Sequence, residues 1–214
     1  MKFQISTQTL KSALDIVNHA TANISTTPIL ENILMKVNYS SIVFTSNNLE
    51  MAIEHIVSEN IKIDLEWTFC VPSKIFTNYI ALLEDDDVNI ELLNDNSIEI
   101  KTNSSDIKIK GNPASDFPLI PVVKETMSFN LKSEILKKSI EKTLFSSANG
   151  SIRPTLAGIY VNINQTIARF ATTDSFRLSE FKIELEQWVN ETFSQIIPNK
   201  TAFWGSNLKV ILLT

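Results

Sequence analysis

The sequence predicts an α+β fold in which antiparallel sheets carry two helices packed on one face. Three observations support this class. Short segments with the two-residue period of strands dominate the chain, a segment with helical period follows the first of them, and the same order of elements returns further along. Strand, helix and then several strands, found twice, is the order expected when helices gather on one face of an antiparallel sheet.

An internal repeat sets the predicted domain organisation. When the chain is shifted by 126 residues, so that Pro154 falls on Pro28, it matches itself without a gap. One module therefore occurs twice. We expect a complete first module over residues 1–122 and an incomplete second module over 123–214, because Thr214 corresponds to Val88. Other matched pairs are Phe3 and Phe129, Leu10 and Leu136, Ala22 and Ala148, Leu30 and Leu156, Phe44 and Phe170, Pro72 and Pro198, and Lys74 and Lys200.

The first half of module one is a strand, a helix and a run of strands. Residues 3–5 alternate as a strand, and Thr7 is placed to cap the helix that follows. The apolar stripe of this helix is Leu10, Leu14 and Val17. The strands expected after it are Ile33–Val37, Ile42–Phe44, Ala52–Val57, Ile61–Leu65 and Phe69–Val71.

A second helix and three strands complete this module. Pro72-Ser73 opens the helix, and its apolar face is Ile75, Phe76, Tyr79, Ile80 and Leu83. The strands are Val88–Leu92, Ser97–Lys101 and Asp106–Lys110. Three prolines in Gly111–Lys124 indicate a linker between the modules.

The second copy repeats the first part of this order. Phe129–Leu131 is the expected strand and Ser133 the expected helix cap. The helix stripe is Leu136, Ile140 and Leu144, and a strand follows in which Ile159, Val161 and Ile163 alternate with Tyr160 and Asn162.

Phe170–Ser179 is a candidate functional corner. Thr172–Ser175 are small, turn-forming residues, so a strand should end in a turn there. After the turn, Phe176 and Leu178 stand on either side of Arg177. Two interpretations remain open. The corner is either an ordinary one with Phe176 and Leu178 in the core, or an exposed apolar patch with a guanidinium held beside it.

The distribution of charge matters more here than its sum. A net charge of −5 argues against a nucleic-acid binder, because cations supply much of the affinity for DNA. However, one predicted helix gathers lysines while the carboxylates fall mostly in predicted strands and loops. Such a chain could hold DNA against its helices, and a solvated amphipathic helix is the alternative. The lysines are Lys132, Lys137, Lys138 and Lys142.

The residue pattern offers no catalytic, metal or cofactor site. His19 and His55 lack the cysteine or carboxylate arrangement of a zinc site or a triad. No phosphate-cradling or dinucleotide-binding glycine motif occurs. The run 85–87 of three aspartates is better explained as a solvated turn than as a metal site. The single cysteine, Cys70, and the absence of a signal peptide favour a cytoplasmic protein. The absence of catalytic motifs favours a protein that is not an enzyme.

Several motifs, taken in order and spacing, resemble one family. They are the Met1-Lys-Phe3 start, Pro28–Leu34, Asn48–Glu50, Val71–Lys74, Ala114–Pro118, Arg153–Gly158 and Thr173–Leu178. Together they reach from the first residue to about Thr201, and they resemble the bacterial DNA sliding clamp, the β subunit of DNA polymerase III. Members of that family have three such modules. This chain has one and most of a second, so it resembles a clamp truncated at its C-terminal side.

The resemblance implies a non-catalytic processivity factor of the DNA polymerase III complex in DNA replication. Family clamps are head-to-tail homodimers that form a ring around duplex DNA, with helices lining the hole and sheets outside. They hold DNA without reading its sequence. The cations that the resemblance places near DNA are Lys11, Lys74, Lys137, Lys138, Lys142, Arg153 and Lys200.

The resemblance also implies a pocket for short peptide motifs of the polymerase III catalytic subunit, the clamp loader and repair proteins. The matching pocket residues are Leu156, Thr173, Asp174, Ser175, Phe176, Arg177 and Leu178. Many members have Gly-His or Gly-Tyr where Ser175-Phe176 stands, and the other wall comes from the third module. The implied subunit interface uses Lys74, Ile75, Ile107 and Ile109. Without a third module, closure of the family's ring is not expected.

Three functions therefore remain as hypotheses. The first is a sliding clamp in truncated form. The second is a non-encircling decoy or regulatory fragment that binds replication partners, and DNA-independent peptide binding would separate it from the first. The third is a small-ligand-binding or hydrolytic α+β protein, which needs a compact polar pocket that the sequence does not offer. Turnover of a substrate would support that third hypothesis.

Overall fold

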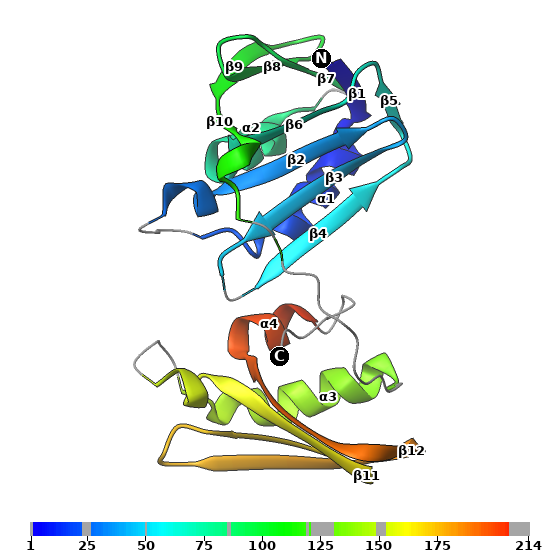
Figure 1. Ribbon diagram of the computed structural model, residues 1–214, viewed down its shortest axis with the longest axis vertical. Helices are drawn as coiled ribbons and strands as arrows, with labels where there is room; N and C mark the ends of the chain where they lie inside the picture. The colour runs from blue at the N-terminus through cyan, green and yellow to red at the C-terminus, as the bar shows by residue number, and fades with distance from the viewer. Residues whose placement is uncertain are drawn as a thin grey trace. The chain divides into compact units, whose positions relative to one another are not determined.

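The chain folds as two compact units, Met1–Ile120 and Pro121–Thr214. The computed structural model describes residues 2–22, 27–49, 51–84, 87–118, 120, 131–148 and 153–205. Each unit combines antiparallel strands with helices packed on a sheet, which confirms the predicted α+β class (Figure 1). The predicted module boundary between residues 122 and 123 lies outside the described residues and stays a prediction.

Unit 1 is built from two five-stranded antiparallel sheets. The first has the order β5 (Ile61–Ile63), β1 (Lys2–Ser6), β7 (Asp87–Leu92), β8 (Ser97–Lys101) and β9 (Asp106–Lys110). The second has the order β10 (Asn112–Pro113), β6 (Trp67–Pro72), β2 (Asn32–Asn38), β3 (Ser41–Asn47) and β4 (Ala52–Val57). Alternation places the apolar side chains of β2 on one face, where Ile33, Met35 and Val37 are all buried as predicted.

Two helices lie on the second sheet of unit 1. Helix α1 (Thr7–Asn18) packs against β3 and β4, and α2 (Ser73–Leu82) packs against β2 and β6. Leu10, Leu14 and Val17 of α1 are buried, as the helical stripe predicted. The prediction for α2 was wrong at Ile75, whose side chain is 58% exposed, because Phe76 and Ile80 are the residues that turn toward the core.

The predicted helix caps and the predicted linker need correction. Thr7 and Ser133 are the first helical residues, so the N-cap positions fall on Ser6 and Lys132, and neither caps with its side chain. The first part of Gly111–Lys124 belongs to unit 1: it forms β10 and the 3-10 turn Ala114–Asp116, and Phe117 is buried. Gly111 lies so close to β6 that a Cβ there would stand 2.2 Å from the carbonyl oxygen of Cys70.

The described part of unit 2 has a two-stranded sheet with two α-helices on the same face (Figure 1). The sheet consists of β11 (Gly158–Thr173) and β12 (Leu178–Pro198), and the helices are α3 (Ser133–Thr143) and α4 (Asn199–Gly205). Two 3-10 turns, Leu144–Ser146 and Pro154–Leu156, connect α3 to the sheet. Of the predicted strand Phe129–Leu131, only Leu131 lies within the described residues, and it is not in a strand.

The strand registers agree with the internal repeat. Register shifts around Gln165 divide β11 into two arms, which pair with the two ends of β12. The first arm pairs Ile159 with Ile197. Shifted back by 126 residues, these positions are Ile33 and Val71, which pair in the same way between β2 and β6. The second arm corresponds to β3 in the same way, since Phe170 pairs with Phe181 where Phe44 pairs with His55.

The two units have separate apolar cores of unequal size. Among the described residues, the core of unit 1 holds many more buried apolar side chains than that of unit 2. Part of the difference lies in the first helix, because α3 turns the hydroxyls of Ser139 and Thr143 inward where α1 has Ala13 and Val17. None of the helices that the structure describes is long and apolar enough to cross a membrane.

Candidate functional site

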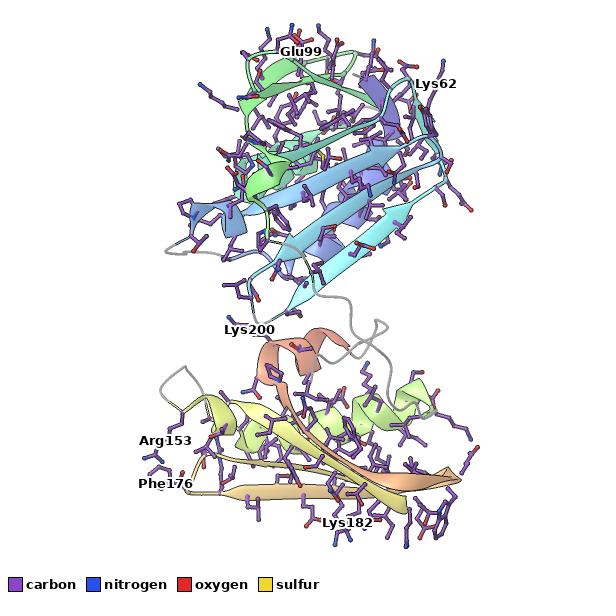
Figure 2. All side chains as sticks on the ribbon, viewed as in Figure 1. Lys62, Glu99, Arg153, Phe176, Lys182 and Lys200 are labelled. Carbon is purple, nitrogen blue, oxygen red and sulfur yellow. The ribbon has the colours of Figure 1, made fainter. Side chains whose placement is uncertain are left out.

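The corner between β11 and β12 exposes the largest apolar side chains of the motif. Phe176 is 97% exposed and Leu178 is 72% exposed. Phe176 stands at the tip of the corner, at the same end of unit 2 as Arg153 (Figure 2). The interpretation that placed Phe176 and Leu178 in the core was therefore wrong, and the interpretation as an exposed apolar patch is confirmed.

Hydrogen bonds within the corner hold its backbone in one conformation. The carboxylate oxygen Oδ1 of Asp174 accepts the backbone N–H groups of Phe176 and Arg177, each at 3.0 Å. The hydroxyl of Thr173 accepts the N–H of Ser175 at 3.1 Å and donates to the carbonyl oxygen of Arg177 at 2.8 Å. Turn-forming side chains that bond to the backbone two or three residues on are the usual way to fix such a turn. The patch is thus ordered before anything binds to it.

Two guanidinium groups flank this patch. Arg177 Nε lies 2.9 Å from Asp174 Oδ2, and Arg153 Nη1 donates to the hydroxyl of Ser175 at 3.2 Å. The Arg177 side chain is 59% exposed, so the pair contributes little to stability, but it fixes the direction of the guanidinium. The family resemblance grouped Arg153 with the DNA-facing cations, whereas in the structure it bonds to the corner. No spacing in the sequence signals that bond.

Leu156 lies in the turn that joins Arg153 to the sheet. It is half-buried, its N–H bonds to the carbonyl of Arg153 at 3.0 Å, and its own carbonyl accepts the N–H of Ala148 at 3.0 Å. Because Arg153 is bonded to Ser175, this turn and the corner lie at the same end of the sheet. The structure thus gathers the residues of the predicted pocket at one end of unit 2.

Ser175 occupies a backbone conformation that suits glycine. Its φ angle is 79°, in the left-handed region, where a side chain costs roughly 1 kcal/mol. Glycine takes this conformation without the penalty, which gives a physical reason for a Gly-His or Gly-Tyr pair at this place. In the present chain the serine hydroxyl instead accepts the bond from Arg153.

Unit 1 contains the repeat counterpart of this corner, in which Asn48 and Met51 replace the ion-paired Asp174 and Arg177. Leu49 has a φ of 69°, and its N–H bonds to Asn47 Oδ1 at 2.8 Å. Asn48 stands where Asp174 stands, and it accepts the N–H of Met51 at 2.8 Å. Because Met51 takes the place of Arg177, the described residues of this corner form a similar turn without the ion pair. It therefore serves as an internal comparison for the ion pair of the second corner.

The pKa of Asp174 is lowered from its ordinary value, chiefly by the backbone hydrogen bonds from Phe176 and then Arg177. A carboxylate with a lowered pKa stabilises the folded corner above the ordinary carboxyl pKa, about 4, and loses that effect as the pH falls through its own lower pKa. The stabilisation that the Asp174 carboxylate gives to the folded corner should therefore not change between about pH 5 and 8.

Replacing Asp174 with asparagine tests this electrostatic contribution. The amide oxygen of the new side chain can still accept the backbone bonds, but it forms no ion pair with Arg177. We expect hydrogen exchange at Phe176 and Arg177, corrected for intrinsic rates, to be about three- to tenfold faster than in the unchanged chain near neutral pH. In the unchanged chain, protection of these amides from exchange should decrease when the pH is lowered below about 4. D174N should show no such decrease. An identical step in D174N would contradict the role of this carboxylate.

Apart from Arg153, the predicted DNA-facing cations of unit 2 lie on one side of its sheet. Lys137, Lys138 and Lys142 are exposed on α3, and Lys200 is exposed on α4, which packs on the same side of the sheet (Figure 2). The opposite side of the sheet carries paired charges: Arg169 and Lys182 both lie within 3.7 Å of Glu180. The helix side of unit 2 is therefore the better placed of the two to attract phosphates.

The cations of unit 1 are less uniform. Lys74 is exposed on α2, but the ammonium of Lys11 donates to the carbonyl oxygen of Leu83 at 2.7 Å. That carbonyl is at the end of α2, where a cation interacts favourably with the helix dipole. Lys11 is therefore engaged in joining α1 to α2, and its prediction as a DNA contact has the weakest geometric support of the group.

The predicted interface residues do not all face outward. Strand β9 is the edge of its sheet, as the prediction required, and Ile75 is exposed on α2. Ile109, however, is only 4% exposed and Ile107 is half-buried, because both alternate toward the core opposite Ile98 and Ile100. The Ile109 side chain therefore packs into the core of unit 1, and the participation of this edge strand in a subunit interface stays a prediction.

Outside the corner, unit 1 has an open cavity of about 940 Å³ beside the start of α1. Its lining mixes the cations Lys11 and Lys62 with the carboxylates Glu84 and Asp87, so it favours neither sign of ligand. Within the described part of the chain, no group of histidine, cysteine and carboxylate side chains is arranged to hold a metal ion. The aspartate run 85–87 lies partly outside the described residues.

Comparison with known proteins matches both units. Residues 1–121 match the family model of the DNA polymerase III beta subunit, N-terminal domain, and residues 130–208 match that of the central domain. The beta sliding clamp of Mycoplasma capricolum is 28% identical over 212 residues, which cover 95% of this chain and 56% of that protein. The chain thus spans about half the length of the curated relatives it matches.

Solved structures show the same fold. The beta chain of DNA polymerase III from Streptococcus pneumoniae has a TM-score of 0.90 at 25% identity, with 96% of this chain and 56% of that chain covered. A Helicobacter pylori beta clamp bound to a DNA ligase peptide has a TM-score of 0.84 at 23% identity, with 97% and 59% covered. With a family model matched over more than half of its residues, the chain belongs to the DNA polymerase III β subunit family, the bacterial sliding clamps, which are non-catalytic processivity factors.

Proposed function

We propose that this chain acts in DNA replication as a sliding-clamp subunit that docks short peptides of the polymerase III catalytic subunit and the clamp loader. The main support for the proposal is the corner 173–178. It presents an apolar patch, Phe176 and Leu178, beside the fixed guanidinium of Arg177. Exposed aromatic and arginine side chains on a rigid support are the typical anchors of a protein interface.

The proposal includes contact with duplex DNA through the helix side of unit 2. Lys137, Lys138 and Lys142 are exposed on α3, and such cations attract phosphates whatever the base sequence. The helices lie on one side of the sheet, and the charged side chains Arg169, Glu180 and Lys182 lie on the other (Figure 2). A surface of this kind supports diffuse attraction to DNA while the protein as a whole remains acidic.

Peptide binding tests the proposed role of the corner. The probe is a synthetic copy of the DNA ligase peptide that the Helicobacter pylori clamp binds, labelled for fluorescence anisotropy. Because Phe176 is almost fully exposed, Phe176→Ala should leave folding intact and lower the affinity about tenfold or more. The matched control is Leu49→Ala on the corner of unit 1, which should bind as the unchanged chain does. Equal affinities in all three proteins would contradict the assignment.

A second candidate function is partner binding without encirclement of DNA. It is favoured by the corner 173–178, which exposes Phe176 and Leu178 within unit 2 alone. Retention on circular DNA separates the two functions. Retention that disappears when the DNA is linearised supports encirclement, and equal behaviour on circular and linear DNA supports binding without a ring.

A further inference from the structure

Strand β9 forms an edge of unit 1 to which another strand can be added. Within the described residues it pairs only with β8, at the end of its five-stranded sheet. The side chains of Asp106, Lys108 and Lys110 are exposed on one face of β9, whereas Ile107 and Ile109 alternate toward the core. An edge strand of this kind has backbone N–H and C=O groups that can pair with a strand of another chain.

Hydrogen bonds at the two ends of β9 identify those backbone groups. Just before β9, the carbonyl oxygen of Ser105 accepts the N–H of Thr102 at 2.9 Å. Just after it, the N–H of Gly111 donates to the carbonyl oxygen of Asn96 at 3.0 Å. In an antiparallel ladder, residues bonded to the neighbouring strand alternate with residues whose backbone groups point away from it. The odd-numbered positions of β9 therefore bond to β8, and positions 106, 108 and 110 point to the open edge.

The side chains at these positions are self-complementary about Lys108. Asp106 precedes Lys108 by two residues, and Lys110 follows it by two. When two copies of β9 run antiparallel with Lys108 at the centre, Asp106 of each copy lies opposite Lys110 of the other. Opposite charges that face each other across a ladder stabilise the pairing and fix its register.

The central Lys108 lies opposite its own copy, and a carboxylate beside it offsets that repulsion. Glu99 of β8 is the cross-strand partner of Lys108, and their charged atoms are 3.7 Å apart. The Glu99 side chain is only 12% exposed, so this carboxylate is held close to the sheet. Each copy therefore brings a negative charge to the centre together with its lysine.

Helix α2 adds apolar surface beside the same edge. The hydroxyls of Tyr79 and Ser105 are 2.8 Å apart, which places this helix next to the start of β9. Ile75 and Leu82 lie on the same side of α2 as Tyr79, four residues before it and three after it. They are 58% and 80% exposed. A second chain seated on β9 would remove part of this apolar surface from water, which favours association.

We propose that the β9 edge of unit 1 binds a second copy of this chain, with the two β9 strands antiparallel about a two-fold axis at Lys108. Main-chain bonds from positions 106, 108 and 110 join the strands, and the pairs of Asp106 with Lys110 set the register. Both copies use the same edge, so the contact closes on itself, unlike the head-to-tail contact of the family's rings. The inference rests on unit 1 alone and does not depend on the proposed replication function.

A proline substitution tests the main-chain pairing. Analytical ultracentrifugation of the full chain at several concentrations should show a dimer and give its dissociation constant. Lys108→Pro removes an N–H that points to the open edge and is not used by β8, so unit 1 should still fold. We expect it to raise the dissociation constant about tenfold or more, because bonds across the axis are lost. The matched control, Lys108→Ala, keeps the N–H and should dimerise at least as well as the unchanged chain.

A monomer at every concentration of the unchanged chain would overturn the proposal. Equal dissociation constants for Lys108→Pro and Lys108→Ala would overturn it as well, because the dimer would then use another surface.

Exchanging the charges of Asp106 and Lys110 tests the register. Asp106→Lys and Lys110→Asp each put like charges opposite each other, so either variant alone should dimerise about tenfold or more weakly. A mixture of the two should form dimers that contain one chain of each, and a chain with both substitutions should dimerise as the unchanged chain does. Both positions are exposed, so this test still decides if Lys108→Pro fails to fold. Single variants that dimerise normally, or a mixture that forms no mixed dimers, would overturn the proposal.

Discussion

Replacing Phe170 with alanine should unfold unit 2 while unit 1 remains folded. Phe170 is among the largest fully enclosed side chains of the smaller core. Removing a buried phenyl group from a packed core costs about 3–5 kcal/mol, because its apolar surface is no longer buried and a cavity remains. A small domain has little stability in excess of that cost, since it buries a smaller fraction of its surface than a large one.

Hydrogen exchange resolved by segment measures the two units separately in one sample. Amides of β11 and β12 should lose protection in Phe170→Ala, and those of β2 and β3 should keep theirs. The matched variant is Phe44→Ala, the same position in the first copy, which should destabilise unit 1 by a similar amount. Loss of protection in both units from either single variant would show that they unfold as one body, contrary to the separate cores described above.

Replacing Lys137, Lys138 and Lys142 together with glutamine should lower the affinity for duplex DNA by roughly a hundredfold at low salt. Removing a cation that neutralises one phosphate lowers the slope of log affinity against log salt concentration by about 0.9, because fewer counterions are released on binding. Removing all three cations therefore lowers the slope by up to about 2.7. All three side chains are exposed on α3, so folding should be unaffected.

Fluorescence anisotropy of a labelled duplex, titrated at several salt concentrations, gives both quantities. The control is Lys182→Gln on the opposite side of the sheet, where the ammonium lies 3.5 Å from Glu180 (Figure 2). That variant should keep both the affinity and the salt slope of the unchanged chain. If Lys182→Gln weakened binding as much per lysine as the α3 variant, DNA would be bound by overall charge and not by the helix side.

The elements with the clearest periodicity were predicted from the sequence to within a residue. Ala52–Val57, Ser97–Lys101 and Asp106–Lys110 have the bounds that the structure gives, because alternating apolar residues are bracketed there by turn-forming ones. The repeat was also visible in the sequence. The sequence could not show that Gly111–Phe117 belongs to unit 1. Prolines indicate a linker, but they also occur where a short strand adds to the edge of a sheet.

Predictions that depend on tertiary contacts were less secure. Lys11 bonds to Leu83, which is distant in the chain, and no local pattern signals that bond. Ile109 was assigned to an outer edge, but the side to which it points is set by its pairing with Ile98. The motif identified the corner residues. Whether Phe176 and Leu178 were core or surface remained open, because the same alternation serves both arrangements and only the tertiary packing decides between them.

The peptide site can be mapped residue by residue with nuclear magnetic resonance, which tests the proposed docking at the corner itself. The full chain is labelled with nitrogen-15 and titrated with the same DNA ligase peptide. We predict saturable shifts of the amides of Thr173–Leu178 and of Arg153, with none at Asn47–Met51, the unit 1 corner whose described residues lack the ion pair. Saturable shifts at the unit 1 corner, or no saturable shift in either corner, would contradict this prediction.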